Sequence, residues 1–289
     1  MNKTKIEWCD STWNPVTGCF HNCEYCYARG IAHRFGGASE THNNETCNEC
    51  QWFTEAEGKI HELDEPVYDY DRQHYAPYPF EFDPTLHRYR LDEYEKKKGR
   101  TIFVCSMSDL FGSWVPDSWI EEVFAACKKA PQHRYLFLTK NPNRYIELAK
   151  KGLLPQSDNM WYGYSATRQS ELWTFKHADE CPAIHLFVSI EPILEPIVPG
   201  FSSHCPADWV IIGAETGHRK AKVTPVRKWI EQIEMECEYS GRPLFMKDSL
   251  APIVGEKNMR REFPWDQQFK SVAKEAGMQA TQEVLQSAT

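Results

Sequence analysis

The chain has 289 residues, of which 41% are hydrophobic, and its 33 basic and 41 acidic side chains give a formal net charge of -8. This length suffices for one large α/β domain with a buried core. The acidic balance excludes a global attraction to nucleic acid or anionic lipid, although a local basic groove stays compatible with it. No apolar run approaches the roughly 18 residues of a membrane span, and the polar start lacks a signal-peptide core. We therefore expect a soluble, cytoplasmic protein that does not bind membranes.

The cysteines carry the strongest chemical signal. There are eleven of them, and three form a CxxxCxxC pattern at Cys19, Cys23 and Cys26. The pattern follows a predicted strand at 13–17 and precedes a helix that starts near Tyr27. Three thiolates can hold three irons of a [4Fe-4S] cube and leave the fourth iron without a protein ligand, whereas an electron-transfer cluster is normally closed by four cysteines. The alternatives are a zinc knuckle or structural thiols, although no fourth ligand at zinc-finger spacing lies nearby.

This spacing, with Tyr25 before the last cysteine, resembles the signature of the radical S-adenosylmethionine (SAM) superfamily. The resemblance implies that SAM chelates the free iron and is cleaved by one electron to methionine and a 5'-deoxyadenosyl radical. It also implies that Tyr25 shields the cluster. The electron would come from a donor such as flavodoxin or ferredoxin.

Two narrower resemblances extend along the chain. Residues 6–15 look like the opening of a phage- and prophage-associated three-cysteine family of unknown function, although Cys9 stands where that family usually shows Thr. Some of its members also space the first two cysteines more widely. Residues 14–29 are similar to the cluster loop of spore photoproduct lyases and their relatives, which makes nucleic acid or a nucleotide a candidate substrate. Further blocks that resemble the phage-associated family lie at 106–111, 138–140, 189–192 and 213–217.

After the first predicted helix, residues 36–100 are polar, contain four prolines and lack sustained periodicity. This composition predicts an insertion, and a lid over the active site and a surface excursion are both compatible with it. Within the insertion, Cys47 and Cys50 form a CxxC. This pair is either a second metal site or two free thiols.

From residue 101 onward, short β-branched and aromatic runs alternate with amphipathic stretches, which is typical of buried parallel strands and the helices between them. The predicted strands lie at 101–105, 135–138, 161–164, 185–188, 209–212 and 244–246, and clear helices at 118–129 and 226–240. With the first strand, about six to seven parallel strands result. They predict an α/β fold, a partial (β/α) barrel of the radical SAM type. The barrel domain is expected over 1–265, with a helical tail at 266–289.

Polar residues follow nearly every predicted strand, at the end where a parallel barrel gathers its functional groups. By the general plan of the superfamily, we assign them to SAM binding. They are Ser106, Ser108, Asp109, Lys140, Ser165, Ser189, Glu191, Glu215 and Lys247. Each serine or aspartate alternatively caps the following helix. The two lysines bind the SAM carboxylate, bind an anionic substrate, or pair with Glu191 and Glu215.

The sequence thus predicts a radical SAM enzyme with a [4Fe-4S] cluster and an unidentified substrate, with nucleic acid or a nucleotide among the candidates. The alternative is a non-catalytic Fe-S or zinc protein that binds a partner or nucleic acid. SAM cleavage by the cluster-loaded protein discriminates between the two.

Overall fold

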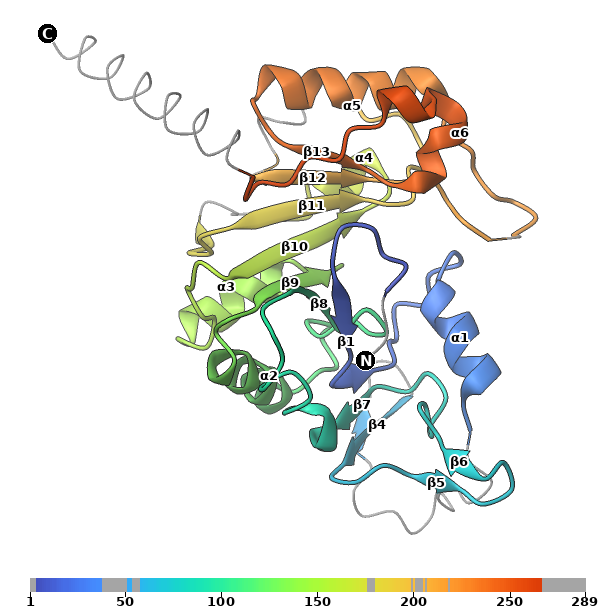
Figure 1. Ribbon diagram of the computed structural model, residues 1–289, viewed down its shortest axis with the longest axis vertical. Coiled ribbons are helices and arrows are strands. Elements are labelled where there is room, and N and C mark those ends of the chain that lie inside the picture. The colour runs from blue at the N-terminus through green and yellow to red at the C-terminus, as the bar shows by residue number, and fades with distance from the viewer. Residues whose placement is uncertain are drawn as a thin grey trace, which may run out of the picture. The chain divides into compact units, whose positions relative to one another are not determined.

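The computed structural model describes residues 4–37, 51–53, 58–175, 180–198, 200, 205, 207–217 and 219–266 (Figure 1). Its main feature is a seven-stranded parallel sheet in the order β1-β8-β9-β10-β11-β12-β13. The strands are β1 (Ser11–Trp13), β8 (Thr101–Val104), β9 (Arg134–Thr139), β10 (Met160–Ala166), β11 (Leu186–Ile190), β12 (Trp209–Ile212) and β13 (Leu244–Met246). The sheet is a partial barrel, open between its edge strands β1 and β13. The predicted α/β class with six to seven parallel strands is confirmed.

The strands of this sheet form where the sequence has short continuous apolar runs. Every residue of β8, β11 and β12 is buried. Strands of a parallel sheet that is covered on both faces have such continuous apolar runs. Strands of a sheet with one solvent-exposed face alternate between apolar and polar residues. The burial therefore explains why the apolar runs located these strands within a few residues.

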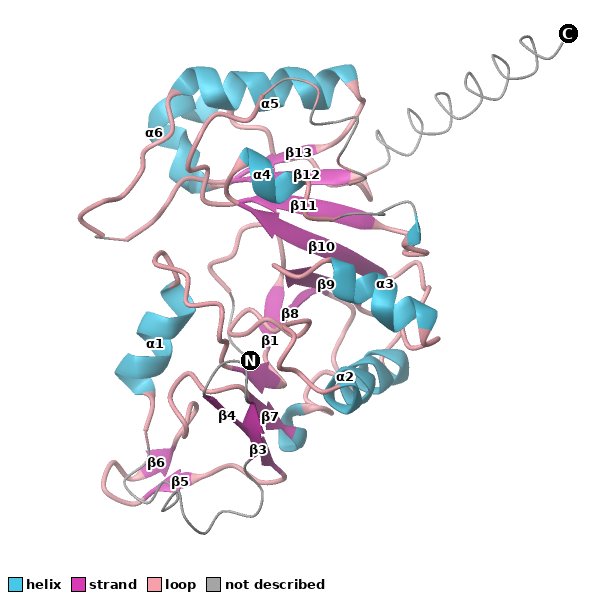
Figure 2. Cartoon of the chain, turned by 180° about the vertical axis from the view of Figure 1, so that it is seen from behind, coloured by secondary structure: helices cyan, strands magenta, loops and turns pink. Residues whose placement is uncertain are grey.

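Helices between the strands bury one face each. In α2 (Asp117–Lys129) the buried residues include Ile120, Val123 and Cys127, at helical spacing. Helix α3 (Asn143–Lys150) buries Tyr145, Ile146 and Leu148. Both views place α2 and α3 on the same side of β8 and β9 (Figures 1 and 2). The remaining helices are α1 (Tyr27–Phe35), α4 (Gln169–Leu172), α5 (Arg227–Tyr239) and α6 (Ala251–Val254), with 3-10 turns at Arg88–Arg90, Asp248–Leu250 and Glu256–Asn258.

The segment predicted as an insertion supplies three strands of a second sheet, in the order β2-β7-β4-β3. Its strands are β2 (Val16–Thr17), β3 (Gln51–Phe53), β4 (Gly58–Leu63) and β7 (Thr85–His87), and a separate pair is formed by β5 (Tyr68–Asp69) and β6 (His74–Tyr75). Strand β2 precedes the cysteine loop directly and pairs with β7 in antiparallel fashion. The insertion is therefore joined by hydrogen bonds to the stretch that leads into the cysteines.

The first predicted strand differs from the observed one. Instead of one strand at 13–17, the chain forms β1 and β2, which belong to different sheets. Asn14 and Pro15 separate them. Proline has no backbone N–H to donate to a ladder, and the Asn14 side chain accepts hydrogen bonds from Ser106 and Met107.

The described residues divide into two compact units. One comprises the chain up to Tyr164 with Thr174–His185 and Gly217–Arg219, and the other comprises Ser165–Trp173, Leu186–Thr216 and the residues from Lys220 on. The first unit contains the cysteine loop, and the second contains α4, α5 and α6.

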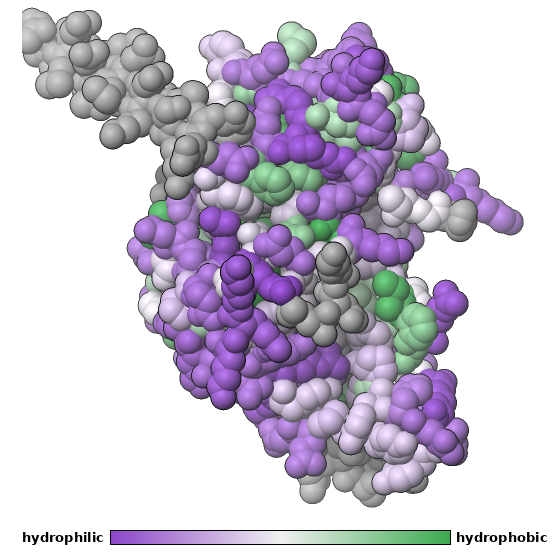
Figure 3. All heavy atoms as spheres, viewed as in Figure 1, coloured by the Kyte–Doolittle hydropathy of each residue, from purple (hydrophilic) through white to green (hydrophobic). Residues whose placement is uncertain are grey.

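The face of the molecule seen in Figure 3 is mostly hydrophilic. Within the described part of the chain, no helix combines the length and apolar character that crossing a membrane requires. Residues 267–289, where a helical tail was expected, lie outside the described residues.

Candidate functional site

The cysteine loop begins at Gly18, whose backbone has a positive φ of 83°. Its N–H donates to the Met107 carbonyl (2.9 Å), and the Cys19 N–H donates to the Phe82 carbonyl (3.0 Å). A Cβ at position 18 would lie 2.1 Å from the Asp83 carbonyl oxygen. Only glycine fits this conformation and this space, so Gly18 fixes the path of the chain into Cys19.

All three cysteines of the motif are half-buried free thiols. The Cys19 Sγ accepts a hydrogen bond from the His21 N–H (3.5 Å), and the Cys26 Sγ caps α1 by accepting from the Arg29 N–H (3.4 Å). Hydrogen bonds to the sulfurs are among the factors that set the reduction potential of an Fe-S cluster. Backbone N–H groups thus hold two of the three sulfurs in place.

The charges around the loop act on the thiols in opposite directions. Burial raises the pKa of the Cys19 thiol well above its usual range, and the Asp109 carboxylate adds to the effect, whereas the His21 N–H opposes it. Burial also raises the pKa of the Cys23 thiol. The nearby Lys140 ammonium opposes this rise without cancelling it. Because a metal takes thiolates, loading this loop would release protons, and the metal would supply the positive charge that the buried thiolates lack.

The donor set of the loop fits an iron-sulfur cluster. Among the described residues, no three His, Cys, Asp or Glu side chains converge on one point as the ligands of a single ion do. A cube held at three corners sets a different requirement, because each cysteine binds a different iron. The loop offers three half-buried thiols, the donor type that such clusters take, and two of them are bonded to backbone N–H groups.

Three of the residues predicted to bind SAM lie directly after β8 and bond to the stretch around the cysteines. The Ser106 Oγ donates to the Asn14 Oδ1 (3.1 Å), and the Ser108 Oγ donates to the Val16 carbonyl (3.1 Å). Asp109 Oδ2 lies 2.7 Å from the Nε2 of His21. Their role as SAM contacts stays a prediction.

Lys140 and two tyrosines lie on another side of the loop. The Lys140 Nζ donates to the Tyr25 hydroxyl (2.8 Å) and lies 5.3 Å from the centre of its ring. The Tyr27 hydroxyl donates to the Ser106 carbonyl (2.9 Å). The cysteine loop is therefore joined by side-chain bonds to the ends of both β8 and β9, as the rim arrangement of a parallel sheet predicts.

The other predicted site residues belong to the second compact unit. Lys247 and Glu191 form a short ion pair, and a Cβ on Gly213 would lie 3.2 Å from the side chains of both. Three roles were left open for Lys247, and in the structure it is paired with Glu191. Ser189 and Glu215 are buried, and Glu215 accepts a hydrogen bond from the Val223 N–H (3.4 Å). Ser165 is half-buried at the end of β10.

Residues that the sequence reasoning missed hold the loop together. His21 and Asn14 bond to the segment after β8. Arg29 donates to the Cys19 carbonyl (3.2 Å) and stacks over Phe82 at 4.9 Å. His21 lies inside the cysteine motif, so its position was a signal that could have been used. The partners of Asn14 and the Phe82 ring beneath Arg29 are far along the chain, so no local pattern predicts these contacts.

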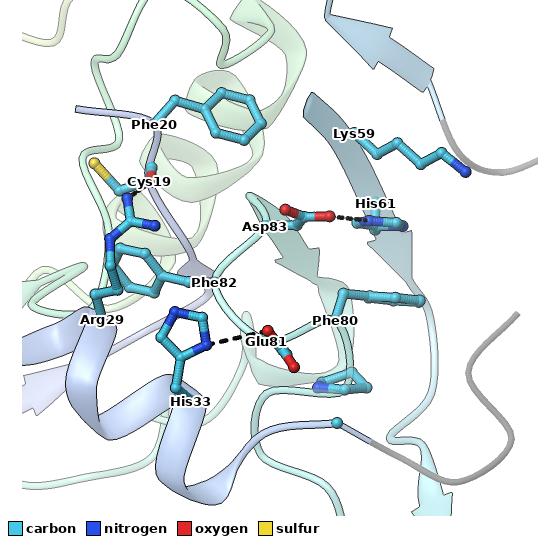
Figure 4. Close-up of a pocket in the computed structure, with 12 residues that line it drawn as sticks. Cys19, Phe20, Arg29, His33, Lys59, His61, Phe80, Glu81, Phe82 and Asp83 are labelled. Atoms are coloured by element: carbon cyan, nitrogen blue, oxygen red, sulfur yellow. Dashed lines mark hydrogen bonds and ion pairs between the residues drawn. The ribbon is translucent and has the colours of Figure 1, made fainter. Parts of the chain in front are cut away.

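A pocket of about 410 Å³ adjoins Cys19 in the first unit (Figure 4). Two histidine–carboxylate pairs line it, His33 with Glu81 (3.0 Å) and His61 with Asp83 (3.3 Å). The His61 ring also stacks on Phe80, with the ring centres 3.7 Å apart. Cys47 and Cys50, the predicted second metal pair, lie outside the described residues.

Comparisons with known proteins give a family and one similar solved structure. The chain is similar to a spore photoproduct lyase complexed with dinucleoside spore photoproduct, at 10% identity and a TM-score of 0.41. That match covers 81% of this chain and 62% of the lyase chain, so less than two thirds of the lyase is spanned. The curated proteins contain no match. A family model described as protein of unknown function (DUF5131) matches residues 3–279, and the chain therefore belongs to this family.

Proposed function

We propose that the protein is a radical SAM enzyme whose [4Fe-4S] cluster is held by Cys19, Cys23 and Cys26. The observation that carries the proposal is the cysteine loop itself. The loop carries three half-buried thiols at CxxxCxxC spacing. Gly18 fixes the path of its backbone, and backbone N–H groups are bonded to the Cys19 and Cys26 sulfurs. When bound, the cluster supplies the electron that cleaves SAM, and its fourth iron is open to SAM because the loop offers three cysteines.

The residues around the loop would bind and orient SAM. Tyr25, which accepts a hydrogen bond from Lys140, would shield the cluster. In the second unit, Glu191 and Lys247 present a carboxylate and an ammonium group at the ends of β11 and β13. Such a pair is complementary to the amino and carboxylate groups of an amino-acid ligand. With Ser165, Ser189 and Glu215, these groups are the proposed SAM contacts of that unit.

For the substrate we propose a nucleic acid or nucleotide, on the resemblance of the cysteine loop to that of photoproduct lyases. The net charge of -8 disfavours tight duplex binding at physiological salt, so a single strand or a mononucleotide fits the chain better. The electron donor would be a small redox protein of the flavodoxin or ferredoxin class.

The decisive experiment is anaerobic reconstitution with iron and sulfide, followed by incubation with SAM and dithionite. We expect broad Fe-S absorbance and 5'-deoxyadenosine, both abolished in Cys19→Ser, Cys23→Ser and Cys26→Ser. Cys127→Ala is the matched control, because Cys127 is buried in α2 away from the motif; it should keep both signals. A fully loaded cluster that leaves SAM intact would refute the enzyme in favour of a non-catalytic Fe-S protein.

A further inference from the structure

Three groups of the protein itself hold the carboxylate of Asp109. Its Oδ2 accepts from the Lys140 N–H (2.9 Å) and pairs with the His21 Nε2 (2.7 Å), and its Oδ1 accepts from the Phe111 N–H (3.1 Å). An ionised carboxylate has about four lone-pair sites. Most of them are used within the protein, in a side chain that is 7% exposed.

The contacts of the His21 ring fix where it lies. Its Nε2 is within hydrogen-bond distance of the Asp109 Oδ2 (2.7 Å). The ring also packs edge-on against Trp114, with the ring centres 4.8 Å apart. His21 is thus held in both position and orientation.

His21 lies between Cys19 and Cys23 in the chain, and its own N–H donates to the Cys19 sulfur. Fixing its ring therefore fixes the backbone between two of the three thiols. We propose that Asp109 and His21 form a clamp, in which Asp109 is a positioning residue that holds the cysteine loop rather than a ligand of SAM. The purpose of the clamp, to keep the thiols placed for a cluster, rests on the proposed function; the clamp itself is a property of the chain without metal.

The test uses three histidine variants of the full chain. His21→Phe keeps a ring against Trp114 and removes the donor, whereas His21→Gln restores an N–H donor at the reach of Nε2. His133→Phe is the matched control. His133 is a buried histidine whose ring makes two hydrogen bonds to the backbone, and it precedes β9, at the other end of that strand from Lys140.

The first measurement is the alkylation rate of each thiol in the metal-free protein, by iodoacetamide and peptide mass spectrometry. We expect His21→Phe to raise the rates at Cys19 and Cys23 about tenfold, the effect of losing one charge-assisted hydrogen bond. His21→Gln and His133→Phe should match the wild type at both positions. Half-buried Cys181 serves as the internal reference and should not change.

The second measurement is the rate at which reconstituted protein loses iron to a chelator. His21→Phe should lose iron faster than the wild type, and His21→Gln and His133→Phe should lose it at the wild-type rate. Equal alkylation in His21→Phe and wild type would overturn the clamp. An equal rise of the alkylation rates in His133→Phe would also overturn it, because that would indicate general loosening of the fold. So would a His21→Gln variant whose alkylation rates stay as high as those of His21→Phe. A wild type that takes up no iron would refute the proposed function, while the alkylation rates still decide the clamp.

Discussion

Gly18 is the residue on which the geometry of the cysteine loop depends most directly. Its positive φ and its close approach to the Asp83 carbonyl leave no room for a side chain. The same residue donates to the Met107 carbonyl, so three separate segments meet at one Cα. Backbone strain at a single position would therefore propagate into Cys19, the next residue.

Gly18→Ala tests this dependence. We expect the free energy of unfolding to fall by at least about 2 kcal/mol, because alanine adds both a strained φ and a clash with backbone atoms. The measurement is urea denaturation followed by tryptophan fluorescence.

Gly30→Ala is the control for this prediction, since Gly30 lies in α1 and a Cβ there would meet nothing within 4 Å. It should raise stability by about 0.5–1 kcal/mol, the usual gain of alanine over glycine in a helix. Equal stability of the two variants would contradict the close approach at Gly18.

At the scale of elements, α2 and α3 are tied together by one carboxylate. Asp117 lies in the first turn of α2, where a negative charge is favourable, and pairs with Arg144 and Lys151 at 2.5 Å each. Arg144 belongs to α3, and Lys151 follows its last turn. The hydrogen bond from Lys151, together with Arg144, lowers the pKa of Asp117.

Asp117→Asn should therefore destabilise the protein in a pH-dependent way. A lowered folded-state pKa means that the carboxylate stabilises the fold above its unfolded pKa of about 3.9, and that this contribution is lost as the pH falls through the folded-state value. We expect a deficit of about 0.5–1.5 kcal/mol at pH 7 in the variant, consistent with partly exposed pairs.

Thermal unfolding at a series of pH values checks this. The difference in the free energy of unfolding between wild type and Asp117→Asn should narrow as the pH drops below about 4. A difference that is constant with pH would show that the ion pairs contribute nothing and that packing alone is affected.

At the scale of the whole molecule, the cluster is expected to contribute to stability. A group that binds the folded chain and not the unfolded chain stabilises it by an amount that grows with the logarithm of its concentration relative to its dissociation constant, and metal sites are a strong case. Because the loop connects β2 to α1 and bonds to the segment after β8, tightening it should stabilise several elements together.

Anaerobic reconstitution should raise the Tm of the wild type by at least about 5 °C, as scanning calorimetry under nitrogen would show. Cys23→Ser should show no such rise, and Cys127→Ala should rise like the wild type from a lower starting value. An unchanged Tm in loaded wild type would mean that the cluster does not bind the folded chain in preference to the unfolded chain.

Much of the fold could be predicted from local pattern. The runs at 209–212 and 244–246 became β12 and β13 without change, and the amphipathic stretch at 118–129 became α2 with one more residue. These elements could be predicted because burial on both faces of a parallel sheet leaves a continuous apolar run, and burial of one face of a helix leaves a helical period. The region from 36 to 100 lacked both patterns, and its strands pair in a small separate sheet and as a separate hairpin pair.

The roles of individual polar residues were harder to predict. Ser106 and Ser108 were correctly placed at the end of a strand, yet their hydroxyls bond to Asn14 and to the Val16 carbonyl, more than 90 positions away. A hydroxyl that holds backbone and one that would bind a cofactor look the same in sequence. Only the identity of the partner separates them.

By itself the sequence determined the three-cysteine spacing, the parallel sheet and the placement of polar residues at the strand ends, because each is written in residues that are near neighbours in the chain. The tertiary structure decided which of those residues bond to one another: Asp109 with His21, Lys140 with Tyr25, and Lys247 with Glu191. Such pairings form where distant segments are packed together and buried polar groups must find partners, and no local pattern encodes that choice.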